Sequence, residues 1–163
     1  MNIALIGMPT CGKSTIGVVV AKLLGLDFVD TDILIQNKYG QKLSKLIEDN
    51  GTEGFLKMES SVIEEVNYED TVIATGGSAV YSEKAMQNLK NISKIIYLKV
   101  PFNEIEKRMT NLKERGVVIE EGKTLKDLFD ERECLYEKYS DITISEENKT
   151  LDETVHEIVK IFD

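Results

Sequence analysis

The chain is poor in the residues that build disulfide frameworks and zinc sites. It contains two cysteines, Cys11 and Cys134, one histidine and no tryptophan among its 163 residues. Two cysteines cannot form a framework of several bridges, and a Cys/His zinc cluster needs more ligands than the chain provides. We therefore expect any bound metal to be held by oxygen ligands, which suits Mg²⁺.

Long apolar segments and an excess of positive charge are also missing. No apolar run approaches the ~20 residues of a membrane span, and the first residues suit a core strand better than a secretory signal, so we expect a cytoplasmic protein. Lysine and arginine number 20 against 29 acidic residues, a formal net charge of −9. Nucleic-acid binding needs clustered positive charge, so we expect no nucleic-acid partner, and mutual repulsion favours a monomer.

The most informative stretch lies at the start of the chain. An apolar run, residues 3–6, leads into the segment 7–14, Gly-Met-Pro-Thr-Cys-Gly-Lys-Ser, which fills every fixed position of the pattern G-x-x-x-x-G-K-[ST]. In such a loop backbone N–H groups surround phosphate oxygens, Lys13 reaches the β- and γ-phosphates, and Ser14 offers its hydroxyl to Mg²⁺. A helix over 14–24 directs its positive end at the same phosphates. The pattern predicts a loop that binds a nucleoside triphosphate; the alternative is a glycine-rich turn that only starts a helix. The expected nucleotide contacts in this segment are Gly7, Pro9, Thr10, Cys11, Gly12, Lys13, Ser14 and Thr15.

Cys11 provides a chemical probe of this loop. A thiol at a helix N-terminus tends to have a lowered pKa. We therefore expect Cys11 to react with an alkylating agent and MgATP to slow the reaction. The alternative is a small loop residue that takes no part in the chemistry.

Apolar strands alternate with amphipathic helices along the whole chain. This alternation is typical of an α/β fold in three layers, with a five-stranded parallel sheet between helices, and indicates one domain, 1–163. The predicted strands cover 3–6, 26–30, 71–74, 94–98 and 141–144. Helices are predicted over 14–24, in three pieces within 31–67 broken near Gly40 and Asn50-Gly51, over 82–90, from Pro101, from Thr124 and near the C-terminus. Periodicity fails over about 110–124, which suggests a mobile lid.

Two predicted strands end in residues suited to ligand binding. The second strand ends in Asp30-Thr31-Asp32, and Gly76 and Gly77 follow the third. Ligands of parallel sheets sit at the carboxyl ends of the strands, and glycine lets a backbone approach a ligand closely. The alternatives are that Thr31 or Asp32 caps the next helix and that the glycines form a plain turn. Glu59, by its pattern alone, suits a solvated helix face.

Taken together, these landmarks resemble those of shikimate kinases, small members of the nucleoside-monophosphate-kinase group of P-loop folds. The resemblance spans nearly the whole chain. Its landmarks are residues 7–15, Phe28-Val29-Asp30-Thr31-Asp32, Phe55-x-x-x-Glu59, Gly76-Gly77, Ile96-Tyr97-Leu98, Arg115 and Glu131-Arg132-x-x-Leu135-Tyr136. The Asp-Thr-Asp strand end and the Glu-Arg-x-x-Leu-Tyr helix are the specific part.

The resemblance implies a role for several of these side chains. Asp30 would support Mg²⁺ through water, while Asp32 would bind the acceptor hydroxyl and act as its base. Gly76 and Gly77 would line the acceptor site.

Three arginines complete the implied site. Arg115 would stabilise the transferring phosphoryl group from the lid, Arg132 would bind the acceptor carboxylate, and Arg108 would lie against the adenine, opposite the loop 146–150. An arginine fork suits a planar carboxylate. Each of these arginines has the alternative of a surface ion pair.

The chain departs from the family pattern at three positions. Leu56 stands where the family motif Phe-Arg-x-x-Glu has arginine, Ser78 replaces the third glycine of a Gly-Gly-Gly run, and Gly116 follows Arg115 in place of proline. Lys57 could supply the missing charge, although it lies about 100° further round the helix.

The leading expectation is therefore an ATP-dependent kinase that phosphorylates shikimate. Leu56 and Ser78 leave open a kinase for another polyol or hydroxy acid, in the manner of gluconate kinases. A nucleotide-binding module without catalysis is a further alternative. A nucleoside-monophosphate kinase is disfavoured, because the stretch 31–65 has no arginine to meet a phosphate on the acceptor.

Overall fold

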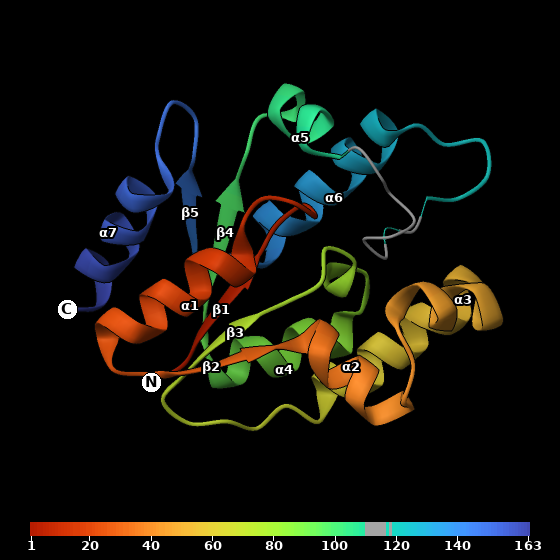
Figure 1. Ribbon diagram of the computed structural model, residues 1–163, viewed down its shortest axis with the longest axis horizontal. Coiled ribbons are helices and arrows are strands. Elements are labelled where there is room, and N and C mark those ends of the chain that lie inside the picture. The colour runs from red at the N-terminus through yellow and green to blue at the C-terminus, as the bar shows by residue number, and fades with distance from the viewer. Residues whose placement is uncertain (110–116, 118) are drawn as a thin grey trace.

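A five-stranded parallel sheet forms the centre of the computed structural model, which describes residues 1–109, 117 and 119–163 (Figure 1). The strands are β1 (Ile3–Ile6), β2 (Asp27–Asp30), β3 (Thr71–Ala74), β4 (Lys94–Lys99) and β5 (Ile142–Ser145), in the order β2-β3-β1-β4-β5. All four pairings are parallel. Every residue of β1 and β3 is buried, as expected for central strands covered on both faces.

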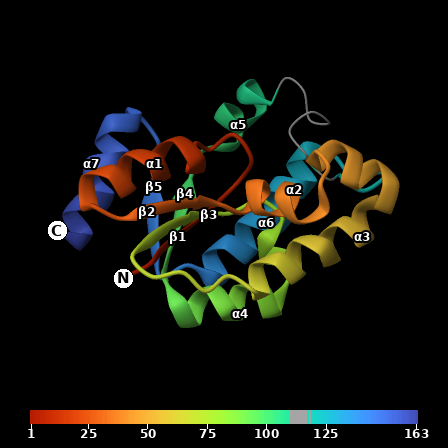
Figure 2. The same ribbon diagram turned by 60° about the horizontal axis from the view of Figure 1, so that its bottom comes forward.

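Helices cover both faces of the sheet (Figure 2). On one face α1 (Lys13–Leu24) packs against β1, β2 and β3, and α7 (Leu151–Phe162) packs beside it. On the other face α4 (Glu83–Ile92) and α6 (Leu125–Tyr139) contact β4. The helix α5 (Phe102–Arg108) lies near the carboxyl end of β4 and contacts α6. The molecule is thus a three-layer α/β structure, as the alternation of strands and helices predicts.

Two further helices extend the molecule beyond the carboxyl end of β2. The first is α2 (Thr31–Tyr39) and the second is α3 (Leu43–Glu64), which is interrupted at Gly51, where φ is 70° and ψ is 179°. The three helical pieces expected within 31–67 are therefore present. A small core of Ile35, Leu46, Phe55 and Val62 joins α2 to α3. This core fixes the α3 residues that face the sheet.

Local sequence signals set the ends of several helices. The side chains of Thr124 and Thr150 cap α6 and α7, and each is joined by an acidic residue three positions later in a capping box. A short 3₁₀ helix, η1 (Ala79–Tyr81), was not expected and follows the glycines after β3. It turns the chain towards α4. No helix in the described part of the chain is long and apolar enough to cross a membrane.

The predicted lid lies largely outside the described residues. Of the segment 110–124, residues 110–116 and 118 fall outside the described residues, and with them Arg115.

Candidate active site

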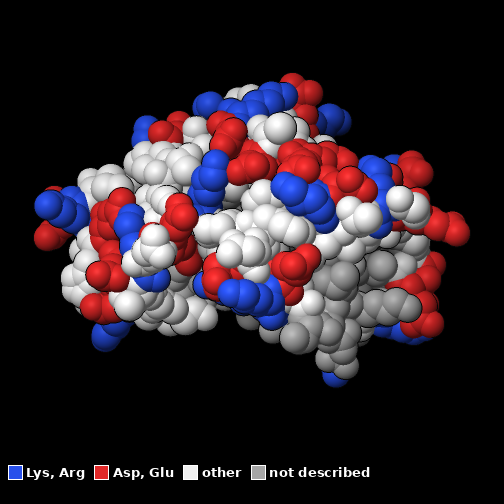
Figure 3. All heavy atoms as spheres, turned by 90° about the horizontal axis from the view of Figure 1, so that it is seen from above, with Lys and Arg blue, Asp and Glu red and all other residues white. Residues whose placement is uncertain are grey.

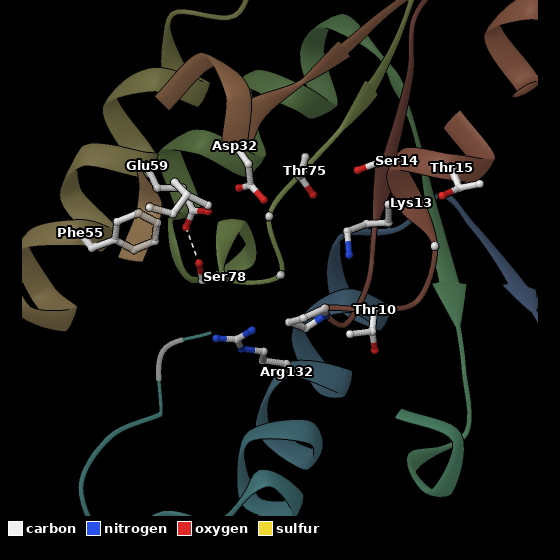
Figure 4. A pocket seen from close by; sticks show the side chains of 15 residues that line it. Thr10, Lys13, Ser14, Thr15, Asp32, Phe55, Glu59, Thr75, Ser78 and Arg132 are labelled. Atoms are coloured by element: carbon white, nitrogen blue, oxygen red, sulfur yellow. Dashed lines mark hydrogen bonds between the residues drawn. The ribbon is translucent and has the colours of Figure 1, made fainter. Parts of the chain in front are cut away.

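One cavity of about 380 Å³ lies at the carboxyl ends of β1, β2 and β3 (Figure 4). It brings together the glycine-rich loop, the start of α2, the inner face of α3, the turn after β3 and the middle of α6. Its lining residues are Pro9, Thr10, Gly12, Lys13, Ser14, Thr15, Asp32, Leu43, Phe55, Glu59, Thr75, Gly76, Gly77, Ser78 and Arg132. Nucleotide-loop residues and expected acceptor residues thus share one space.

The loop between β1 and α1 holds its lysine by its own backbone. Lys13 is 7% exposed, and its Nζ donates hydrogen bonds to the carbonyl oxygens of Gly7 and Met8, each at 2.8 Å. These two carbonyl partners fix the ammonium group at the centre of the loop. In Figure 4 this group points into the cavity from the loop side.

Asp30 connects the loop to the second strand. Its Oδ2 accepts a hydrogen bond from Ser14 Oγ at 2.6 Å, and its Oδ1 accepts one from the backbone N–H of Asp32 at 2.9 Å. The second bond caps α2, so the expected alternative of a cap from Thr31 or Asp32 is wrong: the cap is Asp30. Because the cap uses one carboxylate oxygen, the other remains beside Ser14.

Two carboxylates face each other across Gly76. A Cβ atom built on Gly76 would lie 2.6 Å from Oε2 of Glu59 and 2.9 Å from Oδ1 of Asp32. A side chain at position 76 would have to displace these two carboxylate oxygens, so glycine leaves the space to them. The plain-turn alternative for the glycine pair does not account for this packing.

Burial sets the protonation of both groups. Burial, aided by the neighbouring Asp30 carboxylate and opposed by Lys13, raises the pKa of Asp32 to about 6. Burial also raises the pKa of Glu59 to about 7, against the hydrogen bond from Ser78 and with a further contribution from Asp32. Near neutral pH Asp32 is therefore largely ionised and able to accept a proton, while Glu59 is close to its midpoint.

Glu59 is not the solvated residue that its local pattern suggests. It is 2% exposed, and Ser78 Oγ donates a hydrogen bond to its Oε1 at 2.6 Å. The spacing to Phe55 carries the missed signal, because residues four apart share a helix face and Phe55 is buried in the core. Glu59 therefore belongs to the cavity wall.

Arg132 enters the cavity from α6. Its side chain is 1% exposed, its Nε donates to the hydroxyl of Tyr81 at 3.3 Å, and its guanidinium lies 5.3 Å from the centre of the Tyr81 ring. A Cβ atom on Gly77 would lie 2.7 Å from Pro9 Cδ and 2.9 Å from Arg132 Nη1, so this glycine makes room for the arginine. The surface ion pair considered for Arg132 is therefore wrong.

The opposite side of the loop carries a second group of charged residues. Arg108 Nη1 donates to the carbonyl oxygen of Thr10 at 3.2 Å. Glu146, in the loop after β5, has its pKa raised to about 7 by burial, although Arg108, Lys13 and Lys149 oppose the shift. The structure thus brings Arg108 to the loop, on the side of residues 146–150.

The lowered pKa expected for the Cys11 thiol is wrong. The side chain is fully buried, and this burial raises the pKa of the thiol, outweighing the opposing effect of Lys13. Its Sγ lies 3.5 Å from Lys13 Nζ, under the loop. Position at a helix N-terminus does not lower a thiol pKa when the group is removed from water.

Around Leu56 a side cavity of about 110 Å³ adjoins the main one. Its wall includes Tyr81, Lys123 and Arg132, so an arginine at position 56 would lie beside Arg132. Lys57 does not replace that charge, because its Nζ pairs with Glu53 at 3.3 Å and its side chain is 77% exposed. Lys123 is paired with Glu120 and Glu131, at 2.8 and 3.1 Å.

Oxygen ligands for a metal ion are few in the described part of the chain. There is no cluster there of three or more His, Cys, Asp or Glu side chains suited to a metal. The Ser14 hydroxyl and the Asp30 carboxylate are nevertheless adjacent at the loop. A hard cation that keeps most of its ligands as water and phosphate oxygens, as Mg²⁺ does, fits this pair.

The surface beyond the site carries both signs of charge. Seen from above, acidic and basic side chains intermingle over the described part of this face (Figure 3).

The phosphate-binding loop shares one cavity with the Asp32 carboxylate, which can act as a base, and with the buried Arg132. This combination defines a P-loop kinase for a small hydroxylated acid. Comparisons with known proteins agree with this class. The family profile described as "Shikimate kinase" matches residues 9–163. The chain belongs to the shikimate kinase family, and the expected family, fold and ATP-dependent kinase activity are confirmed.

Several relatives match over nearly their full length. A shikimate kinase from Clostridium botulinum (strain Eklund 17B / Type B) is 39% identical over 163 residues, which cover 98% of this chain and 96% of the relative. The structure of shikimate kinase from Aquifex aeolicus matches with a TM-score of 0.85 at 32% identity, covering 98% of this chain and 95% of the other. Shikimate kinase from Acinetobacter baumannii, in complex with shikimate, matches with a TM-score of 0.87 at 30% identity, covering 99% and 92%.

Proposed function

We propose that this protein transfers the γ-phosphoryl group of ATP to a ring hydroxyl of shikimate, giving shikimate 3-phosphate and ADP, a step towards the aromatic amino acids. The observation that carries the proposal is the single cavity in which Lys13, Asp32 and Arg132 meet. Relatives named as shikimate kinases at 30–39% identity support the choice of acceptor. The gluconate-kinase-like and non-catalytic alternatives have no comparable support.

On the nucleotide side, the loop would bind the phosphates through its backbone N–H groups and through Lys13. The contacts would come from Gly7, Pro9, Thr10, Cys11, Gly12, Lys13, Ser14 and Thr15, with Cys11 contributing backbone only. Arg108, bonded to the loop at Thr10, would lie against the adenine. Positioning and charge stabilisation of this kind supply most of the catalysis of phosphoryl transfer.

Ser14 and Asp30 would hold Mg²⁺, the former directly and the latter through water. Held by these two residues, Mg²⁺ would supply positive charge against the phosphate oxygens. The Ser14–Asp30 hydrogen bond of 2.6 Å already joins the two oxygens on the loop side of the cavity.

On the acceptor side, Asp32 would accept the proton of the attacking hydroxyl group. As it does so, the hydroxyl oxygen of the acceptor bonds to the γ-phosphorus, and the bond between the γ-phosphorus and the oxygen of the β-phosphate breaks, releasing ADP. A carboxylate with a pKa of about 6 is ionised at pH 7 and is a better base than an ordinary aspartate. Arg132 would bind the acceptor carboxylate, beside the close-packed glycines Gly76 and Gly77. Arg115, which lies outside the described residues, would stabilise the transferring group from the lid, 110–124.

We further propose that residues 1–163 act as one kinase domain, with 31–67 forming the acceptor side, and that the protein is a cytoplasmic monomer. The acidic net charge of −9 supports separation of the molecules in solution.

The direct test is an ADP-release assay with MgATP and a panel of acceptors: shikimate, quinate, gluconate and nucleoside monophosphates. We expect turnover that depends on shikimate, with every other acceptor at least about 100-fold slower in kcat/KM, because we expect shikimate to place its carboxylate at Arg132 and its reacting hydroxyl at Asp32 best. Faster turnover with gluconate or quinate would overturn the choice of acceptor and retain the kinase.

A further inference from the structure

Tyr81, the last residue of η1, contacts Arg132 in two ways. Its hydroxyl oxygen accepts a hydrogen bond from Arg132 Nε at 3.3 Å, and the centre of its ring lies 5.3 Å from the guanidinium carbon. In Figure 4 the guanidinium points from α6 towards the acceptor end of the cavity. Rotation of the guanidinium would break both contacts, so Tyr81 fixes the direction in which Arg132 points.

The Tyr81 hydroxyl has a second partner in Glu131, the residue before Arg132. The pKa of Glu131 is lowered by a hydrogen bond from Lys123 and, to a smaller extent, by one from Tyr81. A tyrosine hydroxyl has one proton to donate and an ionised carboxylate can only accept, so Tyr81 donates to Glu131 and accepts from Arg132. Lys123 Nζ lies 3.1 Å from Glu131 Oε2. The hydrogen bonds thus run in one direction, from Arg132 through Tyr81 to Glu131.

The apolar residue at position 56 makes the orientation of Arg132 important. Lys13 and Arg132 are the cations in the described wall of the main cavity, and Lys13 is bonded to carbonyl oxygens of the loop. Leu56 carries no charge, and Lys57 pairs with Glu53 on the exposed side of α3. Among the described residues, recognition of an acceptor carboxylate therefore depends on how Arg132 is held.

We propose that Tyr81 is a positioning residue of the acceptor site: together with Glu131 it holds Arg132 in the orientation that receives a carboxylate, and so gives this protein its selectivity for acidic over neutral acceptors. The proposal rests on the proposed function and deepens it. Tyr81 lines the side cavity and is not part of the wall of the main one, so it acts through Arg132. An arginine fork that is fixed before the ligand arrives loses less conformational entropy on binding.

The test compares shikimate with its carboxamide, which keeps every ring hydroxyl and lacks the negative charge. In the unmodified protein we expect kcat/KM to be about 10- to 100-fold lower for the carboxamide, as for the loss of a hydrogen bond between charged groups. Tyr81→Phe keeps the ring and removes the hydroxyl. It should lower kcat/KM for shikimate about 3- to 10-fold, through a higher KM, and leave the carboxamide nearly unaffected. The KM for MgATP should stay unchanged.

Glu131→Gln tests the same network from its exposed end, where a substitution does not disturb the core. The ratio between the two acceptors should shrink by a smaller factor, about 2- to 3-fold, because an amide oxygen is a weaker acceptor for the Tyr81 hydroxyl. The double variant Tyr81→Phe/Glu131→Gln should resemble Tyr81→Phe, since Glu131 acts through the hydroxyl that is already gone. Tyr68→Phe, which removes a tyrosine hydroxyl outside the cavity, is the matched control and should change neither acceptor.

The acceptor ratio separates positioning from general support of the fold. Equal losses for shikimate and the carboxamide in Tyr81→Phe would overturn the proposal, as would an unchanged ratio in Glu131→Gln. Absence of shikimate turnover in the unmodified protein would instead overturn the proposed function.

Discussion

The two halves of the cavity are built in different ways. Within the glycine-rich loop the polar contacts are local: Lys13 is held by Gly7 and Met8, six and five residues away, and Ser14 meets Asp30 sixteen residues on, while Arg108 reaches the loop at Thr10 from 98 residues away. In the acceptor half Ser78 reaches Glu59 across 19 residues, and Tyr81 and Arg132 are 51 apart. The nucleotide half depends on backbone geometry, while the acceptor half depends on which side chains the fold brings together.

This difference explains where the two halves can vary. A loop whose contacts are backbone groups fixes its own shape, so its motif is complete in this chain. Acceptor residues come from four separate elements, and a change in one can be offset by a change in another. Leu56 and Ser78 lie in this second half.

The largest expected effect comes from the proposed base. Asp32→Asn should lower kcat about 100- to 10,000-fold, because the amide cannot accept the hydroxyl proton. Binding of MgADP, measured by calorimetric titration, should change little. Asp27→Asn, at the exposed start of β2, is the matched control. Unchanged ATP turnover with every acceptor would instead support a non-catalytic nucleotide-binding module.

Removing the loop lysine is expected to have the next largest effect. Lys13→Met should lower kcat by about 100- to 1,000-fold, since a fixed positive charge no longer faces the transferring phosphoryl group. Steady-state rates with saturating shikimate measure this loss. Lys22→Met, on the exposed last turn of the same helix, should leave the rate unchanged. Equal losses in both variants would point to general damage to α1.

The next prediction restores, in the acceptor half of the cavity, the positive charge that is missing at Leu56. Leu56→Arg should lower the KM for shikimate by about 10-fold, because a second guanidinium would adjoin Arg132 at the side cavity. The KM for MgATP should not move, and Leu56→Met should behave as the unmodified protein does. An unchanged or higher KM would mean that the bound acceptor does not place its carboxylate near position 56.

The smallest expected effect is on stability. Because the pKa of folded Glu59 is raised to about 7, the folded state keeps its proton where the unfolded chain has lost it. This contribution is fully present below pH ~4 and is lost as the pH rises towards about 7. We would measure the free energy of unfolding in urea at pH 4.5 and at pH 8. Between these two pH values, Glu59→Gln should become more stable relative to the unmodified protein by about 1–3 kcal/mol. An equal difference at both pH values would contradict the raised pKa.

Most of the fold and the nucleotide half of the cavity can be predicted from the sequence. The strands, the breaks at Gly40 and Gly51 and the phosphate loop all follow from periodicity and local motif, because each depends on neighbouring residues. The burial of Cys11 and of Glu59 does not, since it is set by elements far away in the sequence. Asp30 as the cap of α2 lies between these cases, because several polar residues in a row could each have capped the helix.

The division of the cavity is tested most directly by titrating each ligand separately into three proteins: the unmodified chain, Lys13→Met and Arg132→Lys. We predict a crossed pattern. Lys13→Met should weaken MgADP binding and retain shikimate binding, while Arg132→Lys should weaken shikimate binding about 10-fold or more and retain MgADP binding. If both variants weakened both ligands to the same extent, the two halves would not be separate binding surfaces and the account would be contradicted.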